Sequence, residues 1–144
     1  MIVSARTPTQ KETTKIDPAL KAPMYGLLLW IAGCVLWNVA GVVQVWRGAS
    51  GIGPTASLPV AIVLGLAAIL LVYTARHDLI LFAILSGLFA LGGFAAVYQA
   101  LTGEPSLWPS PFWRWAGAVL NTVGLVAGTV GTARGLLSWK NPTA

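Results

Sequence analysis

The chain has 144 residues, of which 56% are hydrophobic and only 9% are charged, and its formal net charge is +5. An average soluble domain carries roughly a quarter charged residues, so this chain has too few charges to cover a water-facing surface. The composition excludes a soluble enzyme, a disordered chain and a nucleic-acid-binding domain, and it predicts an all-α integral membrane protein. We expect no nucleic-acid partner, because four of the nine basic residues lie in the N-terminal tail and the rest are single residues at the ends of apolar runs, instead of gathering in one stripe.

A polar segment and then four apolar segments follow one another along the chain. Residues 1–22 are rich in Thr, Lys and Pro, and we expect a disordered tail there. The apolar segments are residues 24–46, 58–75, 79–101 and 115–137. Each is long enough for a helix that crosses a hydrocarbon core about 30 Å thick, and only helices satisfy every backbone group within one segment. The predicted membrane domain therefore covers residues 23–139, and residues 140–144 form a short C-terminal tail.

The connections between these segments are short and rich in turn-forming residues. Residues 48–54 (GASGIGP) and 76–78 (RHD) are predicted turns, and residues 102–114 (TGEPSLWPSPFWR) are the longest predicted loop. Short connections place consecutive helices side by side in opposite directions. The predicted fold is a single-domain, four-transmembrane-helix antiparallel bundle.

The placement of Lys and Arg predicts the orientation in the membrane. With the N-terminus inside, the outer face carries Arg47 and Arg114, and the inner face carries the other basic residues: Arg6, Lys11, Lys15, Lys21, Arg76, Arg134 and Lys140. This asymmetry satisfies the positive-inside rule and predicts that both termini are cytoplasmic. We expect a multi-pass protein of the bacterial plasma membrane, with the lipid bilayer as its first partner.

Carboxylates and histidine are missing from the apolar segments, and Arg134, near the end of the fourth segment, is the one basic residue within them. All four carboxylates lie outside these segments, and such groups at depth are what mark proton relays and catalytic sites in membranes. His77 is the only histidine and Cys34 the only cysteine, so the chain offers no cluster for zinc, haem or an iron–sulfur centre. We expect no catalytic residue, no metal and no cofactor, and the same scarcity argues against a proton-coupled drug exporter.

Two asparagines lie within the apolar segments. Asn38 is about 12 Å and Asn121 about 9 Å from the outer ends of their helices by helical rise, so the two amides reach similar depth. They are predicted to hydrogen-bond to each other if the first and fourth helices touch, which would hold the bundle together. The alternative is a polar site for a quinone or a lipid headgroup, beside the aromatic face formed by Trp30 and Trp37.

Small residues recur on one face of the fourth predicted helix. Steps of three and four place them together and predict close helix packing; they are Gly117, Asn121, Gly124, Gly128, Gly131 and Gly135. The face could contact another helix of this chain or another chain, and packing within the chain is favoured because every helix of a bundle has internal neighbours. Predicted reciprocal surfaces are Gly26 and Gly33 in the first helix and Gly87, Gly92 and Gly93 in the third.

The outer loop and the start of the fourth segment are rich in aromatic residues. The residues concerned are Trp108, Phe112, Trp113, Arg114 and Trp115. Such rings favour the headgroup level of a membrane, which predicts an interfacial anchor. The alternative is a docking surface, because Trp and Arg dominate the energetics of protein interfaces.

Without a catalytic constellation, the expected function is non-catalytic. We expect a small accessory or structural subunit of a larger membrane complex, in contact with other membrane protein chains. The alternative is a small transporter or a lipid- or quinone-binding membrane protein whose site lies near Asn38 and Asn121.

Overall fold

The computed structural model of the chain describes residues 15–54 and 56–140. Within these residues the backbone forms four α-helices: α1 (Pro18–Trp46), α2 (Leu58–His77), α3 (Leu79–Thr102) and α4 (Pro111–Lys140). A short 3-10 helix, η1 (Pro105–Leu107), lies between α3 and α4. All four α-helices are long and apolar enough to cross a membrane, so the predicted set of four apolar helices is confirmed.

The first helix begins earlier than its hydropathy predicts. α1 starts at Pro18, so residues 18–22 are helical and their assignment to a disordered tail is wrong. The Asp17 carboxylate accepts a hydrogen bond from the Ala19 backbone N–H, and Pro18 occupies a first-turn position where its missing N–H costs nothing. The helix thus begins at a capping signal and not at the edge of the apolar run. The remaining tail residues 1–14 lie outside the described residues.

The fourth helix also extends beyond its predicted bounds. It begins at Pro111, so only residues 103–110 remain of the loop predicted over residues 102–114. Proline pre-sets the backbone angle of a first helical turn, and the Arg114 N–H already donates to the Ser110 carbonyl at 3.3 Å. The helix runs on to Lys140.

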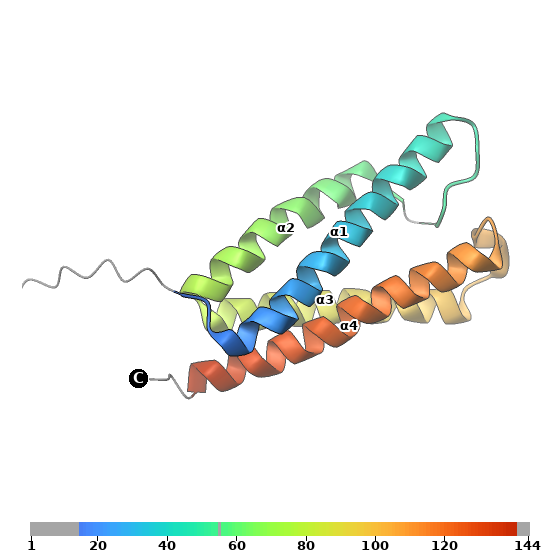
Figure 1. The fold of residues 1–144 in the computed structure, drawn as a ribbon. Coiled ribbons are helices and arrows are strands. Elements are labelled where there is room, and N and C mark those ends of the chain that lie inside the picture. The colour runs from blue at the N-terminus through green and yellow to red at the C-terminus, as the bar shows by residue number, and fades with distance from the viewer. Residues whose placement is uncertain (1–14, 55, 141–144) are drawn as a thin grey trace, which may run out of the picture.

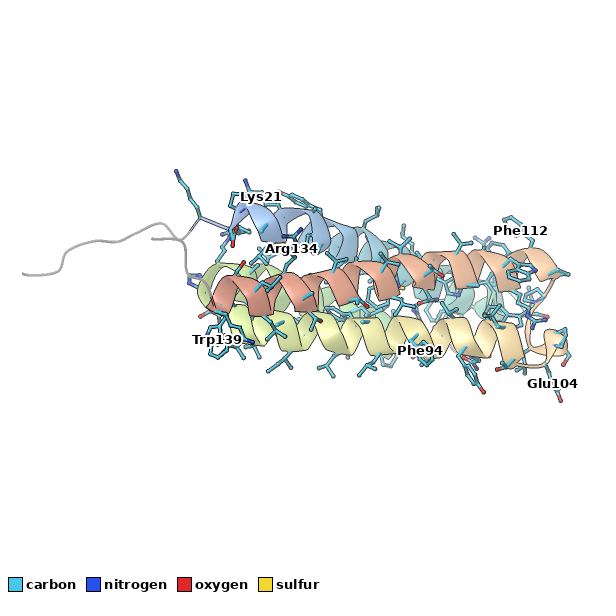
Figure 2. The ribbon with its side chains drawn as sticks, turned by 90° about the horizontal axis from the view of Figure 1, so that it is seen from below. Lys21, Phe94, Glu104, Phe112, Arg134 and Trp139 are labelled. Carbon is cyan, nitrogen blue, oxygen red and sulfur yellow. The ribbon has the colours of Figure 1, made fainter. Side chains whose placement is uncertain are left out.

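The helices are arranged as two pairs, α1 with α2 and α3 with α4, and α4 also packs against α1 (Figure 1). The start of α1, the turn at Asp78 and the end of α4 lie together, and we call this the terminal end. The α1–α2 connection and η1 lie at the opposite end, which we call the loop end. Figure 2 shows Lys21, Arg134 and Trp139 at the terminal end and Glu104 and Phe112 at the loop end.

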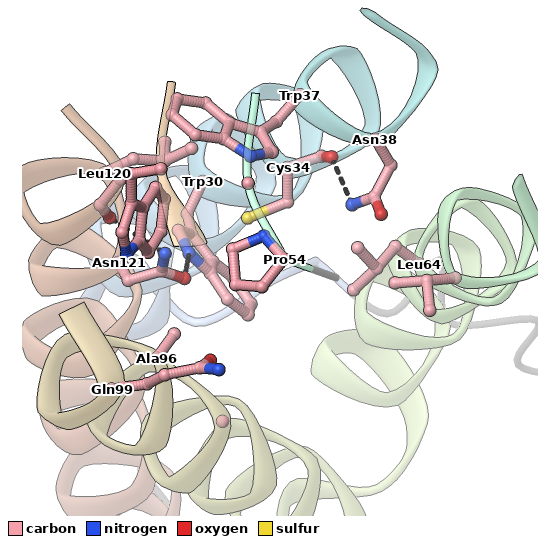
Figure 3. Close-up of a pocket in the computed structure, with 15 residues that line it drawn as sticks. Trp30, Cys34, Trp37, Asn38, Pro54, Leu64, Ala96, Gln99, Leu120 and Asn121 are labelled. Atoms are coloured by element: carbon pink, nitrogen blue, oxygen red, sulfur yellow. Dashed lines mark hydrogen bonds between the residues drawn. The ribbon is translucent and has the colours of Figure 1, made fainter. Parts of the chain in front are cut away.

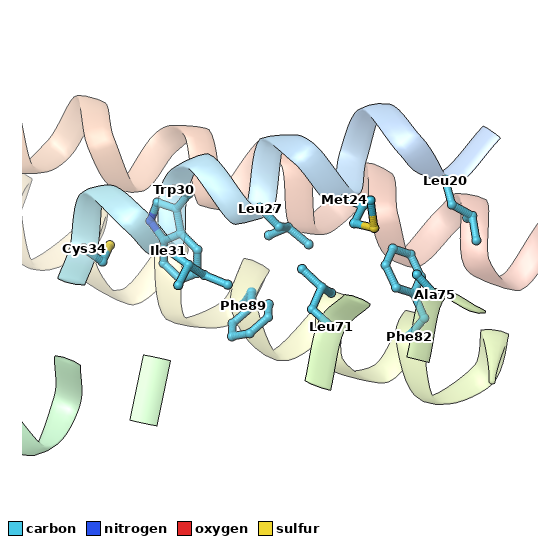
Figure 4. Close-up of a cluster of buried hydrophobic side chains, with 10 residues drawn as sticks. All are labelled: Leu20, Met24, Leu27, Trp30, Ile31, Cys34, Leu71, Ala75, Phe82 and Phe89. Atoms are coloured by element: carbon cyan, nitrogen blue, oxygen red, sulfur yellow. The ribbon is translucent and has the colours of Figure 1, made fainter. Parts of the chain in front are cut away.

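A core of buried apolar side chains joins α1 to the other helices (Figure 4). One face of α1 supplies most of it, and Leu71, Phe82 and Phe89 meet that face from α2 and α3. The Trp30 and Phe89 rings pack edge to face, with their centroids 5.5 Å apart. α1 therefore supplies most of the buried apolar core.

α2 is attached mainly through α1. It is joined to α3 at Asp78, and the two helices diverge from that point (Figure 1). Large apolar side chains of α2 are left exposed along much of its length: Leu58, Val60, Ile62, Val63, Leu66, Ile69, Leu70 and Tyr73. Such a surface suits hydrocarbon and not water, in keeping with a membrane-spanning helix.

Candidate functional site

A cavity of about 220 Å³ lies between the helices in the half of the molecule nearest the loop end (Figure 3). All four α-helices and both connections at that end contribute to its wall. The wall is formed by Trp30, Cys34, Trp37 and Asn38 of α1, Gly53 and Pro54, Val60 and Leu64 of α2, Gly92, Ala96 and Gln99 of α3, Trp108, and Gly117, Leu120 and Asn121 of α4. Asn38 and Asn121 therefore border the same cavity.

Asn38 anchors the start of α2 to α1. Its side chain is buried, its Nδ2 donates to the Cys34 carbonyl at 2.8 Å, and its Oδ1 accepts from the Ser57 backbone N–H at 2.8 Å. Ser57 is the residue that precedes α2, and its own side chain makes no capping hydrogen bond. The amide thus holds the connection that closes the loop end of the cavity.

Asn121 makes the corresponding contact between α4 and α1. Its Nδ2 donates to the Gly117 carbonyl at 2.8 Å, and its Oδ1 accepts from Trp30 Nε1 at 3.3 Å. The hydrogen bond predicted between Asn38 and Asn121 is therefore wrong. The Nδ2 of each asparagine donates to the carbonyl four residues earlier in its own helix. The Oδ1 of Asn38 accepts from the Ser57 N–H and that of Asn121 from Trp30 Nε1, so neither amide bonds to the other.

Tryptophan rings form much of the rest of the wall. The ring of Trp108 packs against two glycines, because a Cβ added to Gly53 or Gly117 would lie 3.2 or 3.3 Å from its Cζ3. Trp37 packs edge to face on Trp113, with their centroids 5.6 Å apart. The Nε1 of Trp108 is buried and has no hydrogen-bond partner among the described residues. This N–H is a donor without an acceptor beside the cavity.

The aromatic residues predicted as a partner contact are divided between the interior and the surface. Trp108 and Trp113 turn inward, and Arg114 donates from its Nε to the Ala100 carbonyl and from its Nη2 to the Leu101 carbonyl at 2.8 Å. Arg114 thereby satisfies carbonyls at the C-terminal end of α3. Phe112 and Trp115 are the members that stay exposed, at 69% and 59%.

The glycine face of α4 packs against α1 and α3. A Cβ on Gly124 would meet the indole of Trp30, and a Cβ on Gly128 would lie 2.6 Å from the Ser86 carbonyl oxygen. A Cβ on Gly131 would lie 2.8 Å from Ser86 Oγ, and a Cβ on Gly135 would lie 3.0 Å from Ala83 Cβ. The face is therefore occupied within this chain.

The glycines of α1 and α3 that are predicted to pack against α4 do not all do so. Gly93 of α3 lies against the α4 backbone, where a Cβ would be 2.8 Å from the Asn121 carbonyl oxygen. Gly26, Gly33 and Gly87 face side chains of α4. Gly92 is different, because nothing lies within 4 Å of an added Cβ and the residue instead borders the cavity.

Gln99 belongs to the cavity wall, a place that its sequence position does not predict. Its amide extends from α3 toward the cavity in Figure 3. From the sequence it is an uncharged polar residue near the end of an apolar segment, the usual place for a residue in the headgroup region. The facing helices are what turn it into part of a site.

The chemistry of the site is that of an uncharged polar and aromatic cavity. None of the described residues in its wall carries a formal charge, and no group of three His, Cys, Asp or Glu residues gathers anywhere in residues 15–54 and 56–140. Indole N–H and amide groups beside apolar surface can bind a carbonyl or hydroxyl oxygen of an otherwise apolar molecule. No family model, no curated protein and no solved structure matches this chain.

Proposed function

We propose that the helices cross a membrane in alternating directions, with both termini in the cytoplasm and the bacterial plasma membrane as the location. The support is the charge at the two ends of the molecule. The terminal end carries Lys15, Lys21, Arg76, Arg134 and Lys140, whereas Arg47 and Arg114 belong to the loop end. Basic residues are enriched on the cytoplasmic side of membrane proteins.

Cysteine labelling in whole cells tests this orientation. In a Cys34→Ala background, which removes the only native thiol, a cysteine replaces either exposed Ser106 at the loop end or exposed Lys140 at the terminal end. A membrane-impermeant maleimide should label the Ser106→Cys protein in intact cells and the Lys140→Cys protein only after permeabilisation. The reverse pattern would overturn the orientation.

We propose further that this protein binds an uncharged amphiphile, a quinone or a lipid with a polar headgroup, in the cavity between its helices. The observation that carries this proposal is the cavity of about 220 Å³ bordered by Asn38, Asn121 and three tryptophans. Small-molecule sites are concave and mostly apolar, with a few polar groups that orient the ligand. The wall also includes Trp108, whose buried Nε1 has no hydrogen-bond partner among the described residues.

The route into the cavity follows from which of its wall residues are exposed. Val60 of α2 is 44% exposed, and Gly92 and Gln99 of α3 are exposed as well, although all three border the cavity. The cavity therefore opens between α2 and α3, the two helices that diverge from Asp78. In a membrane this opening faces lipid, so a hydrophobic molecule reaches the site without passing through water.

The proposed role is binding and not catalysis. Acid–base chemistry needs a group that takes or gives a proton near neutral pH, such as a histidine or a carboxylate with a shifted pKa. The described wall consists of amides, indoles, a thiol and apolar groups. These groups support recognition of an uncharged molecule.

A cavity-filling substitution tests the binding proposal. Gly92→Leu places a large side chain in the cavity at a position where an added Cβ meets nothing within 4 Å, so the fold is expected to persist. Gly65→Leu in α2 is the matched control, because Gly65 is equally open but lies outside the described cavity wall. The probe is a short-chain ubiquinone, titrated in detergent and followed by quenching of tryptophan fluorescence.

The Gly92→Leu protein should bind the quinone about tenfold more weakly, a loss of about 1.4 kcal/mol, while Gly65→Leu binds like the native chain. Mass spectrometry of solvent extracts from the native protein should find a retained quinone or lipid that the Gly92→Leu protein lacks. Equal quenching and equal extracts for all three proteins would overturn the proposal.

A role as an accessory subunit of a larger complex is the second candidate. The observation that favours it is the exposure of Phe112 and Trp115 in the first turns of α4, at the loop end. Native mass spectrometry after purification in a mild detergent separates the two candidates. Reproducible, unrelated partner chains that are lost in a Phe112→Ser/Trp115→Ser protein would favour the subunit. A homogeneous chain with a retained small molecule would favour the binding protein.

A further inference from the structure

Three basic side chains gather around one cavity at the terminal end. Lys15 precedes α1, Lys21 lies in the first turn of α1, and Arg76 lies in the last turn of α2. With Ile16 and Pro18 they line a cavity of about 370 Å³. Figure 1 shows the segment before α1 beside the end of α2, so the fold brings together cations that are far apart in the sequence.

The described carboxylates near this cavity have other partners. Asp17 accepts from the Ser138 hydroxyl at 2.7 Å and from the Ala19 N–H at 2.9 Å. Asp78 accepts from the Leu81 N–H at 2.9 Å as the cap of α3. The cavity wall itself therefore presents two ammonium groups and a guanidinium group.

An apolar groove adjoins this cationic cavity. Arg76 also lines a groove of about 500 Å³ along the α1–α2 seam, whose other members include Leu28 of α1 and Ala68, Ile69 and Val72 of α2. The groove follows the helices away from the terminal end, toward the middle of the bundle. The cationic cavity and the apolar groove thus adjoin each other at Arg76, which lines both.

We propose that this is a binding site for one anionic phospholipid of the cytoplasmic leaflet. Lys15, Lys21 and Arg76 bind the phosphate, and one acyl chain lies in the groove between α1 and α2. Arginine binds phosphate oxygens in a two-pronged geometry, and lysine adds a compact positive charge. Basic pockets between membrane helices on the cytoplasmic side suit anionic headgroups. The site rests on the orientation proposed above and is independent of the cavity at Asn38 and Asn121.

Native mass spectrometry of the full chain in detergent tests the site. The probes are dioleoyl phosphatidylglycerol, dioleoyl phosphatidylcholine with the same acyl chains, and inorganic phosphate. We expect one retained phosphatidylglycerol per chain and much weaker retention of phosphatidylcholine. Equal retention of the two lipids would overturn the proposal, and displacement of the lipid by millimolar phosphate alone would show a site for the free anion instead.

Charge variants locate the site on the molecule. The K21Q/R76Q protein should bind phosphatidylglycerol about tenfold or more weakly, because it loses two of the three cations. The matched control is R134Q/K140Q, which loses the same charge at the same end but outside the cavity, and it should bind nearly as well as the native chain. Equal loss in both proteins would overturn a specific site in favour of general charge attraction.

Two further variants separate lipid binding from folding. Circular dichroism should show that the K21Q/R76Q protein is folded. The K21R/R76K protein keeps both charges and should bind phosphatidylglycerol nearly as well as the native chain. Ala68→Phe fills the groove and leaves the cations in place, so it should weaken lipid retention. Unchanged retention in Ala68→Phe would contradict a role for the groove.

Discussion

At the residue scale, Gly128 brings the backbones of α3 and α4 into direct contact. A Cβ there would lie 2.6 Å from the Ser86 carbonyl oxygen and 2.7 Å from the Ala90 nitrogen, and backbone atoms cannot move aside as side chains do. Gly128→Ala should therefore lower the free energy of unfolding by about 1–3 kcal/mol, the usual cost of overpacking. Circular dichroism during titration of the detergent-solubilised protein with SDS measures this change.

The control is Gly65→Ala in α2, where nothing lies within 4 Å of an added Cβ. This protein should be as stable as the native chain or more stable by up to about 1 kcal/mol, because alanine favours a helix over glycine. An equal loss in both proteins would mean that the close approach of α3 and α4 does not depend on Gly128.

Asp17 is the residue whose charge links the start of α1 to the end of α4. Hydrogen bonds from Ser138 and then from the Ala19 N–H hold its pKa below the ordinary value of 3.8, with a smaller contribution from Arg134 and against the effect of burial. A lowered pKa in the folded state means that the stabilisation is complete above pH 3.8 and is lost as the pH falls through the lower, folded-state pKa.

Asp17→Asn should remove this acid-dependent loss and keep a helix cap, since asparagine caps as well as aspartate does. Unfolding by SDS, measured at neutral pH and at about pH 3, gives the comparison. The native protein should lose more stability on acidification than the variant. Parallel losses in the two proteins would assign the acid sensitivity to other groups.

At the scale of elements, the start of α2 is held to α1 by one amide. Asn38 accepts the Ser57 N–H at 2.8 Å, and Asn38→Leu would leave that N–H without this acceptor. The expected loss of stability is about 1–3 kcal/mol, the cost of an unsatisfied buried group. Asn121→Leu should cost less, because its contact to Trp30 is longer, at 3.3 Å.

Hydrogen exchange followed by mass spectrometry measures where the structure loosens. In the Asn38→Leu protein, protection should fall in the α1–α2 connection and the first turns of α2, while α3 and α4 stay protected. In the Asn121→Leu protein the α2 start should remain as in the native chain. A uniform change along the chain in both proteins would contradict the separate roles of the two amides.

At the scale of the whole molecule, the glycine face of α4 lies inside the bundle. Gly124, Gly128 and Gly131 meet Trp30 and Ser86 of the same chain, so this face is covered within the chain. Gly128→Ala is therefore expected to change stability without changing the number of chains per particle in native mass spectrometry. A change in that number would show that this face contacts another chain.

The helices differ in length, and this difference affects how each one fits a membrane. α1 and α4 have 29 and 30 residues, which corresponds to about 45 Å of helix, whereas α2 has 20 residues and about 30 Å. A hydrocarbon core of about 30 Å is matched by α2, so α1 and α4 must tilt or extend into the headgroup region. The charged residues of these two helices lie toward their ends: Lys21 in the first turn of α1, Arg114 in the first turn of α4, and Arg134 and Lys140 in the last two turns of α4.

The four apolar segments and the placement of charges at their ends could be predicted because hydrocarbon imposes both. A lipid-facing backbone must be helical, and a charged side chain at depth is costly, so composition along the chain reports the helices directly. The helix starts at Pro18 and Pro111 were missed, because hydropathy locates the hydrocarbon core and helices continue past it to their caps.

The sequence by itself determined how many helices can cross the membrane and which positions of α4 are small enough for close packing. Only the tertiary structure decided that Asn38 binds Ser57, that Asn121 binds Trp30, and that Trp108 lies against Gly53 and Gly117. It also decided that Gly92 and Gln99 border a cavity, and that Lys21 and Arg76 lie around another. The physical reason is that spacing along a helix places a residue on a face, whereas its partner depends on how neighbouring helices are rotated and how far they diverge.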